Sequence, residues 1–95
     1  MYVSVRRYEG VSDPSEVPRI VNERWLPIIR EIPGFVAYYW VDAGDSLMIS
    51  TSVFEHSSGE ESNWKAGQFV AQHLTPFMPN APDITAGPVV AHTAK

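Results

Sequence analysis

The chain has 95 residues, of which 44% are hydrophobic and 19% charged, and seven basic and eleven acidic side chains give a net charge of −4. This length fits a single domain, residues 1–95, with a modest core. The charge balance disfavours nucleic acid as a partner, and the lack of cysteine excludes a disulfide framework or a thiolate nucleophile. We find no apolar run long enough to span a membrane and no signal peptide in residues 1–7, so we expect no membrane partner and a cytoplasmic location.

The first part of the chain reads as a strand followed by a helix. Residues 2–8 alternate in character as a strand does. Asp13 and Glu16 have the spacing of a capping box at a helix start. The apolar stripe of this helix is expected to contain Val17, Ile20, Val21, Arg24, Ile28 and Ile29. Pro27 predicts a kink or an early end, and Trp25, which is off the stripe, is expected to pack against the proline-rich connector near the C-terminus.

The rest of the chain predicts a hairpin, a second helix and a last strand. Residues 35–42 and 47–54 are the hairpin strands, with turn residues at 42–45. A polar, acidic start at 57–61 opens a helix that runs to about Leu74, and the last strand follows at 84–92. The order is βαββαβ, an α+β, ferredoxin-like split βαβ layout with both helices on one face of an antiparallel sheet.

Two helices cover only one face of such a sheet. The second strand puts apolar or aromatic side chains on both of its faces: Tyr38 and Trp40 on one, and Phe35, Ala37, Tyr39 and Val41 on the other. An open apolar face of this size is uncommon on a monomer. We therefore expect a homodimer that stacks sheet on sheet through the open face.

Two short segments, together with the element order, carry a family resemblance. One is Ile32-Pro33-Gly34-Phe35, which leads into an aromatic strand. The other is Val53-Phe54-Glu55, ahead of a helix that carries Ser62 and Ala66. With these features the chain resembles the antibiotic biosynthesis monooxygenase-like group of dimeric α/β-barrel proteins. The resemblance implies a ferredoxin-like protomer, a dimer whose two sheets form a barrel, and a pocket between sheet and helices.

The second helix presents one face at helical spacing: Ser62, Asn63, Ala66, Phe69, Val70, His73 and Leu74. We expect His73 on this face to point at the sheet and to act as a general base. Asn63 and Phe69 are expected to contact a substrate. The alternative for His73 is a structural role, in which it bonds a backbone carbonyl near the helix end.

Side chains of the strands complete the predicted site. Arg6 and Arg7 point to opposite faces, so one of them reaches the buried side and needs an anion. That anion is either the oxyanion or enolate of a substrate, for which we select Arg6 as the stabiliser, or an acid such as Glu55. Tyr38 and Trp40 could form a flat wall for an aromatic ligand, although sheet core and dimer interface are the ordinary roles of such residues.

Haem and metal chemistry receive little support from the sequence. The resembling group includes haem-degrading oxygenases that use a tryptophan and a histidine on the second helix and an asparagine on the first strand. Here Trp64 and His73 are nine residues apart and face different ways, and the first strand has no asparagine. His56 and His92 have no partner at ligand spacing, so we expect no metal and no cofactor.

The same group contains cofactor-independent monooxygenases that act on aromatic polyketides, and members without known activity. The resemblance therefore implies a monooxygenase-like oxidoreductase that acts on a small aromatic or hydrophobic compound. In such chemistry the substrate's own carbanion reduces oxygen, while the protein supplies a base, charge stabilisation and a dry cavity. The alternative is a non-catalytic dimeric module of the same fold that binds a small molecule or fills its own cavity.

Overall fold

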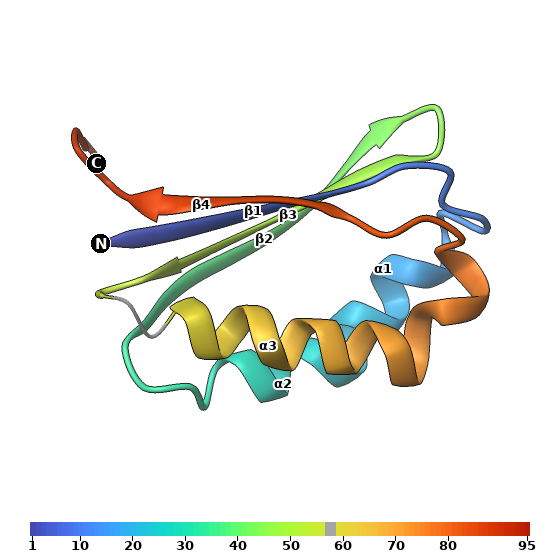
Figure 1. The fold of residues 1–95 in the computed structure, drawn as a ribbon, viewed down its shortest axis with the longest axis horizontal. Coiled ribbons are helices and arrows are strands. Elements are labelled where there is room, and N and C mark those ends of the chain that lie inside the picture. The colour runs from blue at the N-terminus through green and yellow to red at the C-terminus, as the bar shows by residue number, and fades with distance from the viewer. Residues whose placement is uncertain (57–58) are drawn as a thin grey trace.

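The computed structural model describes residues 1–56 and 59–95, so the predicted helix start at Ser57 and Ser58 lies outside the described residues. An antiparallel sheet forms one layer and the helices form the other (Figure 1). The sheet has the order β2-β3-β1-β4, and its strands are β1 (Tyr2–Tyr8), β2 (Phe35–Gly44), β3 (Leu47–Phe54) and β4 (Asp83–Pro88). The α+β, ferredoxin-like class predicted from the sequence is confirmed.

The first helix is built from α1 (Glu16–Ile20), a π-helical segment η1 (Val21–Trp25) and α2 (Leu26–Ile29). Its buried residues are spaced four apart: Val17, Val21, Trp25 and Ile29. In a regular α-helix a spacing of four drifts around the axis, and the wider turn of η1 offsets that drift. The predicted stripe is therefore wrong at Arg24 and Ile28, which are exposed.

The start of this helix also differs from the prediction. The helix begins at Glu16, and its N-cap residue Ser15 makes no side-chain cap bond. Asp13 lies outside the helix with a φ of 50°, and its backbone carbonyl accepts the N–H of Glu16 at 3.0 Å. The capping box is therefore not formed. Pro27 does not end the helix at once, because it lies in the first turn of α2, directly after the wider turn η1, and the helix continues to Ile29.

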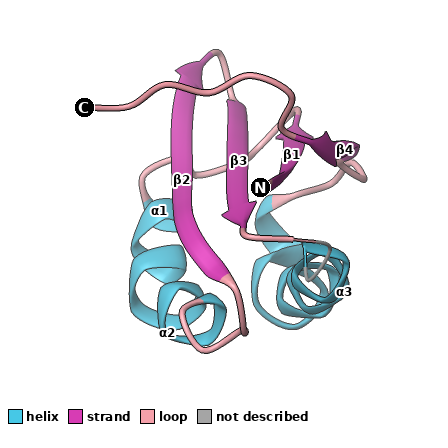
Figure 2. Cartoon of the chain, turned by 90° about the vertical axis from the view of Figure 1, so that its left-hand side faces the viewer, coloured by secondary structure: helices cyan, strands magenta, loops and turns pink. Residues whose placement is uncertain are grey.

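The second helix consists of α3 (Gly59–Phe69) and a second π-helical segment, η2 (Val70–Leu74). It ends at Leu74 as predicted, and a short 3₁₀ turn, η3 (Thr75–Phe77), leads into the connector. Both helices lie against the same face of the sheet (Figure 2). None of the helices in the described part of the chain is both long and apolar enough to cross a membrane.

The hairpin turns later than predicted, because β2 continues to Gly44 and the turn residues are Asp45 and Ser46. Both have positive φ angles, 53° and 62°, as a two-residue type I′ turn requires. At the other end of β2, a register irregularity lies between Phe35 and Ala37. It moves Phe35 to the helix side, where its ring meets that of Phe54 with centroids 5.8 Å apart. The prediction that Phe35 shares a face with Tyr39 is therefore wrong.

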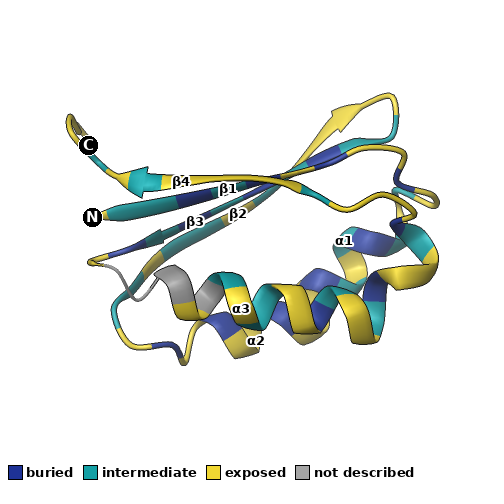
Figure 3. Ribbon diagram, viewed as in Figure 1, coloured by how far each residue is buried: buried dark blue, intermediate teal, exposed yellow. Residues whose placement is uncertain are grey.

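Burial alternates along β1 and β3 (Figure 3). The more buried set belongs to the face that the helices cover, and the other set belongs to the bare face. On β2, Tyr38 and Trp40 pack against the core, whereas Tyr39 is 59% and Val41 46% exposed. The open face of the sheet therefore carries Tyr39 and Val41. The strand residues that flank the cavity described below belong to the covered face.

Candidate functional site

A cavity lies between the covered face of the sheet and the two helices. Six strand residues form its floor: Arg6 and Tyr8 of β1, Tyr38 and Trp40 of β2, and Ser50 and Ser52 of β3. The helices form a mostly apolar roof: Val21, Trp25, Asn63, Ala66, Phe69, Val70 and Leu74. The volume of the cavity is about 20 Å³, which is room for about one water molecule. A ring-sized ligand fits only when a wall side chain moves.

Arg6 brings a positive charge into this cavity, and the residue is only 7% exposed. Its Nη1 donates a hydrogen bond to the phenol oxygen of Tyr8 at 3.2 Å, and its Nη2 donates to the backbone carbonyl of Asn63 at 3.2 Å. Its Nε is buried without a hydrogen-bond partner. Both partners are neutral oxygens, so they satisfy two donors and leave the charge uncompensated.

The two arginines of β1 have different surroundings, as their alternation predicts. Arg7 is exposed and pairs with Glu9 at 3.0 Å. Within the described residues Arg6 forms no ion pair, so the alternative pairing with Glu55 is not found. A buried cation without a counter-charge is costly. Arg6, which the sequence analysis selected as the anion stabiliser, is therefore the arginine of β1 that has no counter-ion among the described residues.

Buried hydroxyl and amide groups surround the guanidinium. Asn63 Nδ2 donates to Ser4 Oγ at 3.0 Å, which ties α3 to β1 beside the cavity. Ser4, Ser50 and Ser52 are all buried on the covered face of the sheet. The small hydroxyl side chains of Ser50 and Ser52, which line the cavity, leave it open where large apolar residues would fill it, and they add hydrogen-bond donors.

Aromatic rings from both layers enclose the polar centre. The ring of Trp25 lies 6.2 Å from that of Tyr38 and 5.3 Å from that of Phe69, measured between centroids. Tyr8 and Trp40 lie 5.5 Å apart on the floor. Flat apolar walls around a single charged group suit an aromatic ligand with one polar end.

Both phenols of the cavity stay protonated at neutral pH. Burial raises the pKa of Tyr38 well above its ordinary value. Burial also raises the pKa of Tyr8, although the adjacent Arg6 guanidinium offsets part of that rise. In this site the two tyrosines are therefore neutral hydrogen-bonding groups and not bases.

His73 does not line this cavity. It lies on the outer side of Phe69, with ring centroids 4.8 Å apart, in a separate hollow of about 190 Å³ that also borders Trp25 and Lys65. The π-helical segment η2 contains His73, and its wider turn displaces the imidazole from the face that regular helical spacing predicts. The expectation that His73 points at the sheet is wrong, and its role as a base stays a prediction.

The structure brings five of the predicted site residues together around the cavity: Arg6, Tyr38, Trp40, Asn63 and Phe69. Sequence reasoning missed Tyr8, although its position two residues after Arg6 on a strand was a usable signal. It also missed Trp25, which is 3% exposed and contacts Tyr38 and Phe69 rather than serving mainly as packing for the connector.

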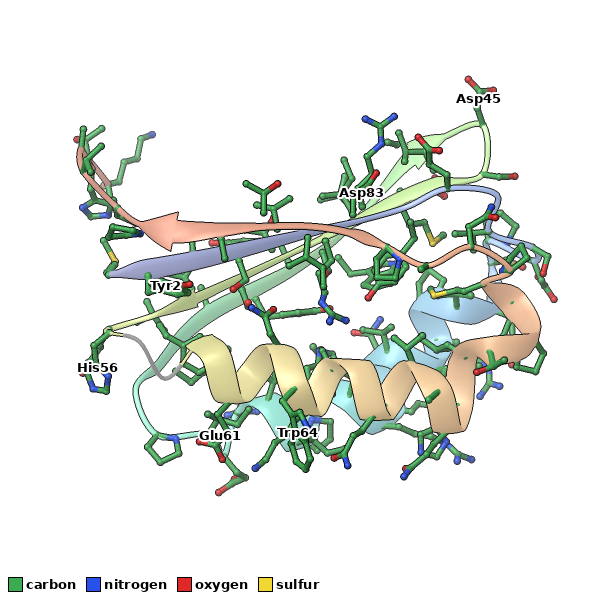
Figure 4. All side chains as sticks on the ribbon, in the orientation of Figure 1. Tyr2, Asp45, His56, Glu61, Trp64 and Asp83 are labelled. Carbon is green, nitrogen blue, oxygen red and sulfur yellow. The ribbon has the colours of Figure 1, made fainter. Side chains whose placement is uncertain are left out.

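Residues outside the cavity bear on haem and metal chemistry. Trp64 is 65% exposed on the side of α3 that faces away from the sheet (Figure 4). Trp64 and His73 therefore do not form the tryptophan–histidine arrangement expected of a haem-degrading relative. Among the side chains that the structure describes, no three from His, Asp or Glu lie together as a metal site requires.

The fold is similar to several solved structures, although no family model and no curated protein matches the sequence. A protein of unknown function from Nitrosomonas europaea has a TM-score of 0.77 at 14% identity, with 99% of this chain and 93% of that chain covered. SnoaB, a cofactor-independent oxygenase from Streptomyces nogalater, has a TM-score of 0.75 at 16% identity over 99% and 97%. The ActVA-Orf6 monooxygenase of Streptomyces coelicolor, solved with the ligand nanaomycin D, has a TM-score of 0.71 at 17% identity over 99% and 92%. The chain therefore has the fold of antibiotic biosynthesis monooxygenase-type proteins, as the resemblance in its sequence predicted.

Proposed function

We propose that the chain is a monooxygenase-like enzyme that acts without an organic cofactor on a small aromatic or hydrophobic compound, and that the Arg6 cavity is its active site. The observation that carries this proposal is a buried guanidinium with a free Nε–H among aromatic rings. A preorganised donor at a place where negative charge develops is worth far more in a dry site than in water. The fold that this chain shares with two oxygenases supports the reaction class.

In this reaction the substrate itself supplies the electrons. Loss of a proton from an activated CH₂ group gives a carbanion whose charge is shared with a neighbouring oxygen, and Arg6 holds that oxyanion through its Nε–H. The carbanion reduces O₂, one oxygen atom forms a bond to carbon, and the other leaves as water. A CH₂ group and O₂ thus become C=O and H₂O. The apolar roof keeps bulk water from the carbanion.

The predicted base, His73, would act at the mouth of this site and not inside it. Phe69 separates the imidazole from the cavity, because it borders both the cavity and the outer hollow. A proton could reach His73 only when the Phe69 ring has moved. Unchanged turnover in His73→Ala would remove His73 from the mechanism and leave the proposal for Arg6 standing.

We also propose that two copies associate through the open face of the sheet. Tyr39 pairs with Thr51 and Val41 pairs with Ile49 in the β2–β3 register, so these side chains form a continuous, largely apolar surface. Such a surface is unfavourable in water and is covered well by an identical surface that stacks on it. The two-fold arrangement needs no other component.

The test is oxygen uptake by the purified protein with a panel of hydroxynaphthalenes and cyclic 1,3-diketones. Wild type should consume O₂ and place one atom of isotopically labelled O₂ in the product carbonyl. Arg6→Met should lose this activity, while the matched control Arg7→Met, which alters the other face of β1, should keep it. If the probes bind to wild type without any oxygen uptake, the alternative of a non-catalytic binding module is correct.

A further inference from the structure

The Arg6 cavity holds a positive charge and, among its described lining, no group that takes up a proton at neutral pH. Of the described lining side chains, Arg6 carries the charge, and Tyr8 and Tyr38 are the ones with an acidic proton. The strand β3 contributes serines, η1 contributes Val21 and Trp25, and the second helix contributes one amide and several apolar side chains. Apart from Arg6 itself, the described side chains that line the cavity are therefore neutral near pH 7.

The described acidic and imidazole groups near the cavity are directed elsewhere. Glu61 of α3 pairs with Lys65 at 3.2 Å on the side of the helix away from the sheet (Figure 4). Glu9 pairs with Arg7 and follows β1 at the surface. His73 lies beyond the Phe69 ring. With the Phe69 ring in place, none of these groups is positioned to compensate the guanidinium or to accept a proton from a ligand bound beside it.

These two facts restrict the charge of the ligand. A neutral ligand would leave the guanidinium as poorly compensated as before, whereas an oxyanion would supply a counter-charge and accept the free Nε–H. A ligand that entered as a neutral acid would find no acceptor for its proton among the described lining side chains. Both phenols hold their own protons more tightly than usual because of burial, so they do not relieve this restriction.

We propose that the Arg6 cavity binds its ligand as a ready-made oxyanion: a small aromatic compound with an acidic ring hydroxyl or enol that has already lost its proton to water. The step is a simple ionisation in solution, in which the O–H bond breaks, the electron pair stays on oxygen and the proton passes to water or buffer. The proposal names the substrate class of the activity proposed above and rests on that function for its biological meaning. Binding of the anion can be measured without turnover.

The test uses 4-nitrophenol, because its phenolate absorbs visible light and its phenol does not. Titrating wild-type protein into the dye at several pH values gives the pKa of the bound dye directly. We expect that pKa to fall by at least about one unit, which corresponds to at least about tenfold tighter binding of the phenolate than of the phenol. The methyl ether 4-nitroanisole, which has the same ring and no acidic proton, should bind at least about tenfold more weakly.

Variants locate the effect at the guanidinium. Arg6→Met should abolish the pKa shift, Arg6→Lys should retain part of it, and the control Arg7→Met should leave it unchanged. Circular dichroism and thermal unfolding establish that each variant is folded before it is titrated. The comparison of nitrophenol with nitroanisole on wild type needs no variant at all.

Three results would overturn the proposal: no binding of 4-nitrophenol at millimolar concentration, binding with an unchanged or raised pKa, or equal affinity for nitroanisole. A lowered pKa that depends on Arg6 supports it. If the phenolate binds in this way and no acidic aromatic compound consumes oxygen, the anion site stands and the proposed monooxygenase function fails. The same protein preparations therefore test the anion site and the monooxygenase function separately.

Discussion

The Arg6 guanidinium donates to the Tyr8 phenol oxygen at 3.2 Å from two residues earlier on the same strand. Strand geometry puts residues two apart on one face, so this contact is set by local sequence. The phenol satisfies one donor and carries no charge, and the same holds for the Asn63 carbonyl. Arg6 is therefore only partly hydrogen-bonded, and its charge is not compensated. Such a charge lowers the stability of the folded chain and is available to bind an anionic ligand.

Arg6→Met should therefore raise stability while it removes ligand binding. Methionine fills a similar volume and needs no counter-charge or hydrogen bonds. We expect the free energy of unfolding to rise by about 1 kcal/mol or more. Urea denaturation measures the change. Arg7→Met, at an exposed position, should change stability by no more than about 0.5 kcal/mol, and a clear loss of stability in Arg6→Met would mean that the charge is compensated in the folded protein.

Tyr8→Phe tests the contact between these two residues. The substitution leaves Arg6 Nη1 buried without an acceptor, so the free energy of unfolding should fall by about 1–3 kcal/mol. In the Arg6→Met background Tyr8→Phe leaves no buried donor without an acceptor, so the loss in the free energy of unfolding should largely disappear. A double-mutant cycle in urea gives the coupling energy, and a value near zero would show that the contact contributes nothing.

Alkaline stability should depend on the buried phenol of Tyr38. Burial raises its pKa in the folded state above the value of about 10 that a tyrosine has in the unfolded chain. Below that pH both states hold the proton and stability is complete. Above it the unfolded chain binds fewer protons, so the free energy of unfolding falls with pH, by up to about 1.4 kcal/mol per pH unit.

Tyr38→Phe should make the alkaline fall in stability shallower, as measured by urea midpoints across the alkaline range. Tyr39→Phe is the matched control, because its phenol is exposed on the open face of the single chain, and both variants are measured at a protein concentration low enough to keep the chain monomeric. An equal effect of the two substitutions would contradict the assignment to burial. Tyr8 has a raised pKa for the same main cause, so part of the slope should remain in Tyr38→Phe.

The strand half of the site followed from the sequence, because alternation is a simple rule that tertiary packing rarely overrides. It put Arg6 opposite Arg7 and grouped Tyr38 with Trp40, and the structure has both relationships. It failed at Phe35, where an irregularity in register changes the parity of the strand. No residue type near Val36 signals that irregularity by itself.

The helix half was predicted less well because both helices contain a π-helical segment. A spacing rule of 3.6 residues per turn placed His73 on the cavity face and Trp25 off it, and both assignments are wrong. The spacing of four from Val17 to Ile29 was visible in the sequence, and it would have included Trp25. The wider turns themselves depend on tertiary packing, which local propensities do not encode.

Tyr39→Asp tests the proposed dimer. Tyr39 lies on the open face, so a carboxylate there should weaken stacking of two sheets and shift native mass spectra from dimer to monomer without unfolding the protein. Trp40→Asp is the contrasting variant. Its side chain packs against the core on the covered face, so this change should lower the thermal midpoint instead. A dimer that is unaffected by Tyr39→Asp would exclude this face as the interface.

The rings of Trp25 and Phe69 form the barrier between the cavity and the outer hollow, since each borders both spaces. With room for about one water molecule behind them, a ring-sized ligand must displace at least one wall side chain. Phe69→Leu removes part of the barrier and keeps an apolar residue, at a cost in stability below the 3–5 kcal/mol typical of Phe→Ala. We expect the association rate of 4-nitrophenol to rise severalfold in stopped-flow measurements.

The control is Val70→Ala, which trims a side chain that borders the cavity and not the hollow. If Val70→Ala accelerates binding as much as Phe69→Leu, the ligand does not pass between Trp25 and Phe69, and the hollow beside His73 is not the mouth of the site.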